Sequence, residues 1–292
     1  MKIIRSKAEL RAMTEDWRRA GDSIGVVPTM GALHAGHLSL VEAACAATDR
    51  VIVTLFVNPK QFNNPEDLAK YPRTEESDAE KLTPYGADVL YVPDGAQMYP
   101  EGFATTISVS GVSDGLCGAT RPGHFDGVAT VVTKLLLQTD ADQAFFGEKD
   151  YQQLQVVRRI AEDLDLKTRI IGCPTIRESD GLAMSSRNLR LDDRARATAP
   201  VIREALSRAA IEIREGVSVE TALQSARSRL TDAGMGEIDY LEFRGDPDLA
   251  ILSTADRPGR IFVAAWLDGV RLIDNVPVHE ASQHERRLEP AD

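Results

Sequence analysis

The sequence predicts an α/β protein with a parallel sheet in residues 1–175 and a smaller α+β domain in residues 176–292. Two observations predict the sheet: short apolar runs end at glycine or proline, and helical patterns lie between them. A third observation predicts the second domain, because the composition changes at Pro174 and several short strands then follow one another. A chain of 292 residues is long enough for both domains.

The chain opens with a helix and then alternates strand, helix and strand. Ser6 and Glu9 have the spacing of a capping box, which predicts a first helix that ends at Gly21. The next expected elements are a strand over 24–27 ended by Pro28 and Gly31, a helix from about Gly36, and an apolar strand over 50–57. The unbroken apolar character of 50–57 is typical of a parallel strand covered on both faces.

The remaining elements follow the same kinds of pattern. In the first domain we expect strands over 88–92, 105–109, 144–147 and 167–173, and an apolar helix over 128–137. The second domain is expected to contain helices over 192–215 and 218–233 and strands over 238–243, 261–267 and 270–273. The charged end, 282–292, is expected to be loose.

The stretch after the strand at 24–27 carries two histidines in a glycine-containing turn, Pro28-Thr29-Met30-Gly31-Ala32-Leu33-His34-Ala35-Gly36-His37. A strand that turns into a helix offers unpaired backbone N–H groups and the positive end of a helix dipole, which suit a phosphate chain. His34 and His37 can point the same way and donate to oxygens that gain charge in a nucleotidyl transfer. A lone His-x-x-His is more often an ordinary loop, but the flanking strand and helix favour the functional interpretation.

Two more polar segments follow strands and therefore fall at the edge where open parallel sheets bind ligands. They are Asn58-Pro59-Lys60-Gln61-Phe62-Asn63 and Gly147-Glu148-Lys149-Asp150-Tyr151-Gln152-Gln153. The amide of Gln61 can donate and accept at once, and the ammonium of Lys149 can reach a phosphate from a helix start. By themselves, the first segment would be a plain turn and Lys149 a solvated surface charge.

These residues resemble known signatures. His34-Ala35-Gly36-His37 resembles the His-x-Gly-His signature of the nucleotidyl-transferring superfamily that includes class I aminoacyl-tRNA synthetases, and the longer 28–37 stretch resembles the pantoate–β-alanine ligase family. The family pattern Arg-Pro-Gly-His-Phe-x-Gly-Val matches from Arg121, and Met184-Ser185-Ser186-Arg187-Asn188 matches its form of a mobile Lys-Met-Ser-Lys-Ser-type loop. The resemblance covers nearly the whole chain and implies a Rossmann-like first domain that binds ATP and pantoate and a second domain that acts as a lid.

The resemblance also implies the chemistry, an ATP-dependent condensation of pantoate with β-alanine through pantoyl adenylate, with Mg²⁺ accompanying ATP. It implies catalytic roles for His34, His37, Lys149 and Arg187, and pantoate or β-alanine binding by Asn58, Gln61 and Gln153. The ATP-binding residues that it implies are Met30, Gly31, Ala32, Leu33, His34, Ala35, Gly36, His37, Gly147, Glu148, Lys149, Asp150, Ile176, Met184, Ser185, Ser186 and Arg187. Arg121 and His124 are expected to be mainly structural, with contact of either residue with the substrate as the alternative.

Composition limits the partners and the compartment. A net charge of −11 without a Lys/Arg cluster argues against nucleic acid or an anionic membrane as a partner. No apolar run is long enough to span a bilayer and the N-terminus lacks a signal peptide's apolar core, so a cytoplasmic location is expected. Cys45, Cys117 and Cys173 lie far apart, which predicts neither a disulfide framework nor a zinc site.

Two other functions remain open at this point. One is a nucleotidyltransferase of the same superfamily that acts on another small acceptor, although Gln61 and Gln153 suit a hydroxy acid better than a phosphate. The other is a non-catalytic nucleotide-binding protein, which would be expected to have lost the motif histidines or lysine. The expectation of a homodimer comes only from the family resemblance.

Overall fold

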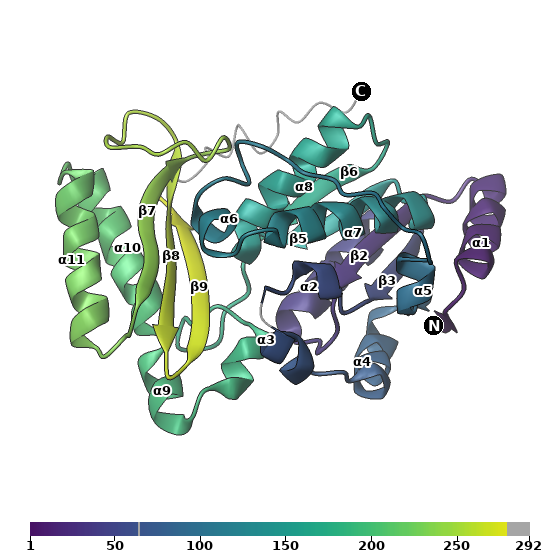
Figure 1. Cartoon of the computed structure of the whole chain (residues 1–292), viewed down its shortest axis with the longest axis horizontal. Coiled ribbons are helices and arrows are strands. Elements are labelled where there is room, and N and C mark those ends of the chain that lie inside the picture. The colour runs from purple at the N-terminus through teal and green to yellow at the C-terminus, as the bar shows by residue number, and fades with distance from the viewer. Residues whose placement is uncertain (64, 279–292) are drawn as a thin grey trace. The chain divides into compact units, whose positions relative to one another are not determined.

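The computed structural model describes residues 1–63 and 65–278. It divides into two compact units, one of Met1–Ile176 with Met184–Ser186 and one of Arg177–Ala183 with Arg187–Asp292. The first unit contains a sheet of six strands and the second a sheet of three (Figure 1). The predicted α/β class, with a parallel sheet followed by a smaller α+β part, is confirmed.

The sheet of the first unit is entirely parallel. Its strands are β1 (Lys2–Ile4), β2 (Ile24–Thr29), β3 (Arg50–Leu55), β4 (Val89–Tyr91), β5 (Gln143–Gly147) and β6 (Arg169–Cys173), in the order β1-β4-β3-β2-β5-β6. The chain runs from β2 outward to β3 and β4 on one side, and later from β5 outward to β6 on the other. The order therefore reverses between β2 and β5, and open parallel sheets bind ligands at such a reversal.

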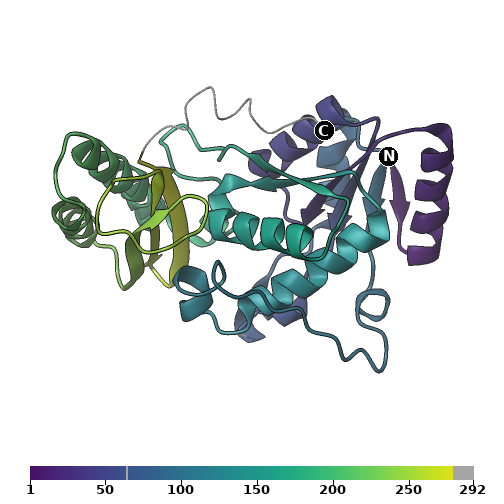
Figure 2. The same ribbon diagram turned by 90° about the horizontal axis from the view of Figure 1, so that it is seen from above.

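Helices cover the sheet on both faces, as right-handed crossovers to opposite sides of β2 require. The helices of this unit are α1 (Lys7–Ala20), α2 (Ala35–Ala47), α3 (Pro65–Lys70), α4 (Glu75–Leu82), α5 (Gly95–Met98), α6 (Leu116–Thr120), α7 (His124–Thr139) and α8 (Tyr151–Asp163), with short 3₁₀ turns η1 (Pro59–Gln61), η2 (Thr83–Tyr85) and η3 (Glu148–Asp150). Figures 1 and 2 show α7 and α8 side by side. The face covered by α2 is packed with Leu40, Val41 and Ala44 of that helix against strand residues such as Val27 and Val53.

The central strand β2 is longer than the sequence predicts. Ile24, Val26 and Val27 have no exposed surface, as a strand covered on both faces requires. The strand then continues through Pro28 to Thr29, so the expectation that Pro28 ends it is wrong. Pro28 keeps the parallel register opposite Thr54 of β3 although it has no N–H to donate, while β5 pairs with β2 only at Gly25 and Val26.

Three other expectations are corrected. Residues 105–109 form no strand, because the Ile107 amide donates to the side-chain oxygen of Thr130 at 3.0 Å instead of to a neighbouring strand. The helix expected over 192–215 is divided at Pro200 into α9 (Asp193–Thr198) and α10 (Val201–Arg214). Ser6 precedes α1 in an extended conformation but makes no side-chain cap bond, so the helix is confirmed and the capping box is not.

The turn η1 is held by an unusually close approach of α7. A Cβ atom added at Gly127 would lie 2.3 Å from the carbonyl oxygen of Lys60 and 2.7 Å from the amide nitrogen of Gln61. The contact is with backbone, which cannot swing away as a flexible side chain could. Only glycine therefore allows this helix to lie against the turn that carries Gln61.

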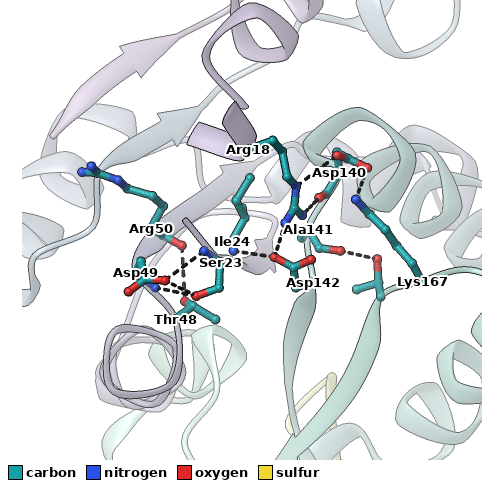
Figure 3. Close-up of polar contacts among 11 residues, drawn as sticks. Arg18, Ser23, Ile24, Thr48, Asp49, Arg50, Asp140, Ala141, Asp142 and Lys167 are labelled. Carbon is teal, nitrogen blue, oxygen red and sulfur yellow. Dashed lines mark hydrogen bonds and ion pairs between the residues drawn. The ribbon is translucent and has the colours of Figure 1, made fainter. Parts of the chain in front are cut away.

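The amino edge of the sheet is tied together by ion pairs and hydrogen bonds (Figure 3). Asp142, just before β5, accepts from the guanidinium of Arg18 at 2.6 Å and from the amide of Ile24 at 2.7 Å. Burial opposes ionisation of Asp142, but these hydrogen bonds and the charge of Arg18 hold its pKa below the ordinary value. Ser23 and Asp49 form a second link at 2.6 Å between the starts of β2 and β3. The strands therefore begin in a fixed relation to one another.

The second unit is an antiparallel sheet packed on two helices. Its elements after α9 and α10 are α11 (Val219–Asp232), β7 (Ile238–Gly245), β8 (Gly259–Leu267) and β9 (Val270–Pro277). The 3₁₀ turn η4 (Ser186–Arg190) precedes α9 and begins with a residue of the first unit. The strand order is β7-β8-β9, and both helices contribute to its core through residues such as Leu206 and Leu230. The prediction for 282–292 lies outside the described residues. No helix among the described residues is long and apolar enough to cross a membrane.

Candidate active site

Three of the segments singled out in the sequence follow adjacent strands. The histidine turn follows β2, the Asn58–Gln61 segment follows β3, and the Gly147–Asp150 segment follows β5. Because β3, β2 and β5 are parallel neighbours, these segments leave the sheet at the same edge. The reversal of strand order lies between two of them, where a ligand crevice is expected.

The turn after β2 is held in a strained conformation by Asp78 of α4. Gly31 and Ala32 have φ angles of 88° and 52°, and only glycine adopts such values without cost. The carboxylate of Asp78 accepts from the amides of Ala32 and Leu33, each at 2.8 Å, and is completely buried. A buried carboxylate that receives two amide hydrogen bonds compensates the strain of the turn.

Two neighbours of Asp78 complete this attachment. The hydroxyl of Thr74 donates to Asp78 at 3.0 Å, and the ammonium of Lys81 donates to the carbonyl oxygen of Leu33 at 2.9 Å. The sequence does not mark these three residues as part of a site, because they lie in a polar helical segment that is typical of a solvated surface. Their only signal in the sequence is that the segment follows the Asn58–Gln61 motif.

His34 and His37 form a reciprocal cap at the start of α2. Nδ1 of His34 accepts from the amide of Gly36 at 3.2 Å, and Nδ1 of His37 accepts from the amide of His34 at 3.4 Å. The ring centroids are 4.1 Å apart. A ring nitrogen that accepts a hydrogen bond carries no hydrogen, so in each neutral ring the proton is on Nε2. The two histidines are therefore assigned as Nε2–H donors.

His37 remains neutral at physiological pH. Burial, followed by the neighbouring His34, lowers the pKa of His37 to about 3. Asp150 raises this pKa, whereas Lys149 and Lys81 lower it further. The ring therefore offers a hydrogen bond to a ligand without a positive charge of its own, and the positive charge nearby comes from the lysines.

The segment after β5 brings Lys149 and Asp150 into electrostatic reach of His37. Lys149 lies in the 3₁₀ turn η3, one turn before α8, and its ammonium is 3.5 Å from the carboxylate of Asp150. The Lys149 side chain is only 16% exposed, compared with 47% for Asp150. A lysine this shielded differs from the solvated surface charge that its sequence neighbours suggest.

Gln61 lies beside the histidine turn and is almost completely buried. Its Nε2 is 3.0 Å from the sulfur of Met30, and its Oε1 accepts from Asn58 at 3.0 Å. Its own carbonyl oxygen accepts from Nδ1 of His124 at 2.9 Å and from Arg121 at 3.3 Å. Arg121 and His124 thus hold the main chain of Gln61.

The adjacent glutamines of α8 have different surroundings. Gln152 is buried and bonds to the backbone of Val112, Gly115 and Cys117 at 3.0–3.2 Å, so it fastens the loop before α6. Gln153, one residue later in the first turn of the helix, is half-buried. The structure thus separates a structural glutamine from the one expected to bind ligand.

The last candidate segment is shared between the two units. Met184 belongs to the first unit, where its amide donates to the carbonyl of Ile176 at 3.0 Å and its Cβ lies 3.7 Å from the Cβ position of Gly36. Ser185 and Ser186 belong to the same unit, whereas Arg187 belongs to the second, which also contains Arg177–Ala183. Arg187 precedes Asn188, whose amide nitrogen donates to Glu178 at 2.8 Å within the second unit.

The family model described as pantoate-beta-alanine ligase matches residues 2–277. The pantothenate synthetase of Chelativorans sp. (strain BNC1) is 67% identical over 276 residues, which cover 94% of this chain and 97% of that protein. The pantothenate synthetase of Ruegeria sp. (strain TM1040) is 60% identical over 94% of this chain and 99% of its own length.

Solved structures show the same similarity. Pantothenate synthetase from Thermus thermophilus superimposes with a TM-score of 0.90 at 44% identity, over 96% of this chain and 100% of that chain. The pantoate-beta-alanine ligase of Francisella tularensis, complexed with beta-gamma ATP and beta-alanine, superimposes with a TM-score of 0.81 at 35% identity, over 95% and 98% of the two chains.

The first prediction concerns the protonation of His37. Its depressed pKa means that the folded protein resists protonation of this ring, whereas the unfolded chain takes up the proton near pH 6.5. The contribution of His37 to stability is therefore complete above pH 6.5 and is lost as the pH falls toward 3. Nitrogen-15 NMR of the imidazoles should show a neutral, Nε2-protonated His37 at pH 5. Titration of this ring near pH 6.5 would contradict the assignment.

Proposed function

The chain belongs to the pantoate–β-alanine ligase family and condenses pantoate with β-alanine using ATP, and we propose that the reaction proceeds through pantoyl adenylate. In the first step, the pantoate carboxylate attacks the α-phosphate of ATP and pyrophosphate leaves. In the second, the β-alanine amine attacks the carbonyl carbon of the adenylate and AMP leaves. Both steps develop negative charge on phosphate oxygens, which oriented donors stabilise.

The observation that carries this proposal is the pair of oriented Nε2–H donors at the start of α2. His34 and His37 are locked by the hydrogen bonds at their Nδ1 atoms, so neither ring has to reorganise as charge develops. We assign phosphate contacts to both rings and to the ammonium of Lys149, which supplies the charge that a neutral His37 lacks. These groups act by position and charge, and the proton that the amine nitrogen loses in the second step passes to solvent.

The remaining nucleotide contacts are assigned to the residues that border these groups. A Cβ atom at Gly31 would lie 3.2 Å from a carboxylate oxygen of Asp78, and one at Gly36 would lie 3.0 Å from the ring of His34, so these glycines permit the close packing that holds the turn and the capping ring. The full proposed ATP site consists of Met30–His37, Gly147–Asp150, Ile176 and Met184–Arg187. Arg187 is proposed to act on the phosphates, and residues 176–292 are proposed to serve as the lid domain.

Pantoate is assigned to Gln61 and Gln153. Both side chains are uncharged amides, which suit a hydroxyl and a carboxylate. Asn58 has no exposed surface, and its side chain is bonded to Gln61 and to the carbonyl of Gly127. We therefore propose that Asn58 serves the pantoate site through Gln61.

The proposed reaction uses ATP together with Mg²⁺. The described residues contain no group of three or more His, Cys, Asp or Glu side chains placed to hold a metal. Mg²⁺ bound with a nucleotide is held largely by phosphate oxygens and one or two carboxylates, and the half-exposed carboxylate of Asp150 suits this role. When bound, the ion would neutralise phosphate charge.

We propose further that the enzyme is a homodimer and works in the cytoplasm.

The proposed function is tested by pyrophosphate–ATP exchange without β-alanine. Exchange should occur and require pantoate, because adenylate formation is reversible and precedes the amine step. His37→Ala and Lys149→Ala should each lower the exchange rate by about two orders of magnitude, the usual effect of removing one oriented donor. Exchange that appears only when β-alanine is added would contradict a free adenylate intermediate. A near-normal exchange rate in either variant would show that the altered residue does not contact the phosphates.

A separate prediction concerns Gln61. Gln61→Ala should weaken pantoate binding by about 1–3 kcal/mol, because polar groups of the bound substrate lose their partner. The KM for ATP should change little. Lys60→Ala is the matched control, since it shortens an exposed side chain of the same turn. The measurement is steady-state kinetics with each substrate varied in turn. An equal rise of the KM values for pantoate and ATP would contradict the assignment of Gln61 to the pantoate site.

The lid assignment predicts leakage of the intermediate. Arg187→Ala should slow adenylation and also let water reach the mixed anhydride, so that AMP forms in excess of pantothenate. Arg190→Ala, in the same 3₁₀ turn η4, is the control. The ratio of AMP to pantothenate is measured by chromatography of quenched reactions. A ratio of AMP to pantothenate of one in Arg187→Ala would contradict a role for the Met184–Arg187 segment in closing the site.

A further inference from the structure

Tyr99 lies outside every motif described above, yet it is bonded to the segment that carries Gln61. Its hydroxyl oxygen is 2.7 Å from Oδ1 of Asn58. Its ring packs against Phe56 and Phe103, with centroids 6.1 and 5.1 Å apart. Burial raises the pKa of Tyr99 to about 12, so the phenol keeps its proton. Tyr99 is thus a fixed hydroxyl donor on the far side of Asn58 from Gln61.

The side-chain amide of Asn58 is oriented by two backbone groups whose roles are unambiguous. The carbonyl oxygen of Gly127 can only accept, so the atom 3.0 Å from it must be Nδ2 of Asn58. The amide of Lys60 can only donate, and it lies 3.3 Å from the opposite atom, Oδ1. The oxygen and nitrogen of Asn58 are therefore assigned without reference to any other side chain.

This assignment fixes the direction of the remaining hydrogen bonds. The second hydrogen of Nδ2 is donated to Gln61 at 3.0 Å, so the atom of Gln61 that faces Asn58 is Oε1. Oδ1 of Asn58 accepts from Tyr99. The nitrogen Nε2 of Gln61 then lies on the other side, toward the sulfur of Met30 at 3.0 Å, which accepts. Hydrogen bonds thus run in one direction from Tyr99 through Asn58 to Gln61.

We propose that Tyr99 is a positioning residue that, through Asn58, holds Gln61 so that its N–H group and not its oxygen faces pantoate. The site then selects an oxygen acceptor, either the carboxylate or a hydroxyl oxygen of the hydroxy acid. Without the phenol, Oδ1 of Asn58 loses its shortest hydrogen bond and retains only the 3.3 Å bond from the Lys60 amide, so the side chains of Asn58 and Gln61 are held less tightly in the orientation that the backbone groups select. This inference rests on the proposed pantoate-binding role of Gln61.

The test compares Tyr99→Phe with Tyr91→Phe. Tyr91 is also buried and donates to an amide oxygen, that of Gln138, at 2.9 Å, but it contacts no part of the Asn58–Gln61 segment in this bond. In the exchange assay, Tyr99→Phe should raise the half-saturating pantoate concentration by about 2- to 12-fold, the effect of one neutral hydrogen bond, and leave that of ATP unchanged. Tyr91→Phe should change neither value. Thermal melting of both variants reports the loss of stability that they share.

A second variant tests the direction of the bonds independently of Tyr99. Gln61→Glu keeps an oxygen for Asn58 and removes the donor, so it should impair pantoate binding at least as much as Gln61→Ala. The proposal is overturned if Gln61→Glu binds pantoate better than Gln61→Ala. It is also overturned if Tyr99→Phe leaves the half-saturating pantoate concentration unchanged, or raises the half-saturating concentrations of pantoate and ATP equally. Absence of pantoate-dependent exchange in the unaltered protein would instead overturn the proposed function.

Discussion

The geometry of the candidate site depends on one constraint, the position of β2 between β3 and β5 in a parallel sheet. Parallel strands all end at the same edge, so the turns after these three strands must be neighbours whatever their side chains are. At the opposite edge, Asp142 joins Arg18 to the first amide of β2, and Ser23 joins Asp49 before β3. The strands are thus aligned where they begin, and the turns are placed where they end.

Within that frame, the histidine turn is stabilised from outside itself. Gly31 and Ala32 have positive φ angles that an isolated peptide would rarely hold. The completely buried Asp78 binds the amides of Ala32 and Leu33, and Lys81 binds the carbonyl of Leu33. A polar helix between β3 and β4 therefore fixes the backbone that leads into His34. This is a general way to keep strain at a site, because the surrounding hydrogen bonds compensate it.

Different residues of the site supply the hydrogen bond and the positive charge. His37 is neutral because burial and the adjacent His34 disfavour its imidazolium, while the lysine at 149 supplies positive charge. A neutral ring with Nε2–H keeps the same hydrogen-bond pattern over the physiological pH range. Two backbone groups likewise orient Asn58 and hence Gln61, so fixed hydrogen-bonding groups are found both in the histidine turn and in the Asn58–Gln61 segment.

The sequence by itself determined the class of fold, the family, and the three segments that gather at the sheet edge. These are local properties: apolar runs define strands such as Arg50–Leu55, glycines define turns, and the order of motifs is written along the chain. Local patterns predicted the ends and the presence of strands less reliably where a hydrogen bond or pairing with a residue distant in sequence decided them. Pro28 stays in β2 because its register with Thr54 is kept, and residues 105–109 are not a strand because Thr130 takes the Ile107 amide.

Only the tertiary structure decided which polar residues support the motifs. Asp78 and Tyr99 lie 46 and 41 residues from Ala32 and Asn58, the residues that they bind, and their own neighbours in sequence give no sign of those partners. The tautomers of His34 and His37 likewise follow from backbone amides brought to Nδ1 by the start of α2. Hydrogen-bond direction and burial depend on atoms that are distant along the chain, so they are settled by folding and cannot be read from a local pattern.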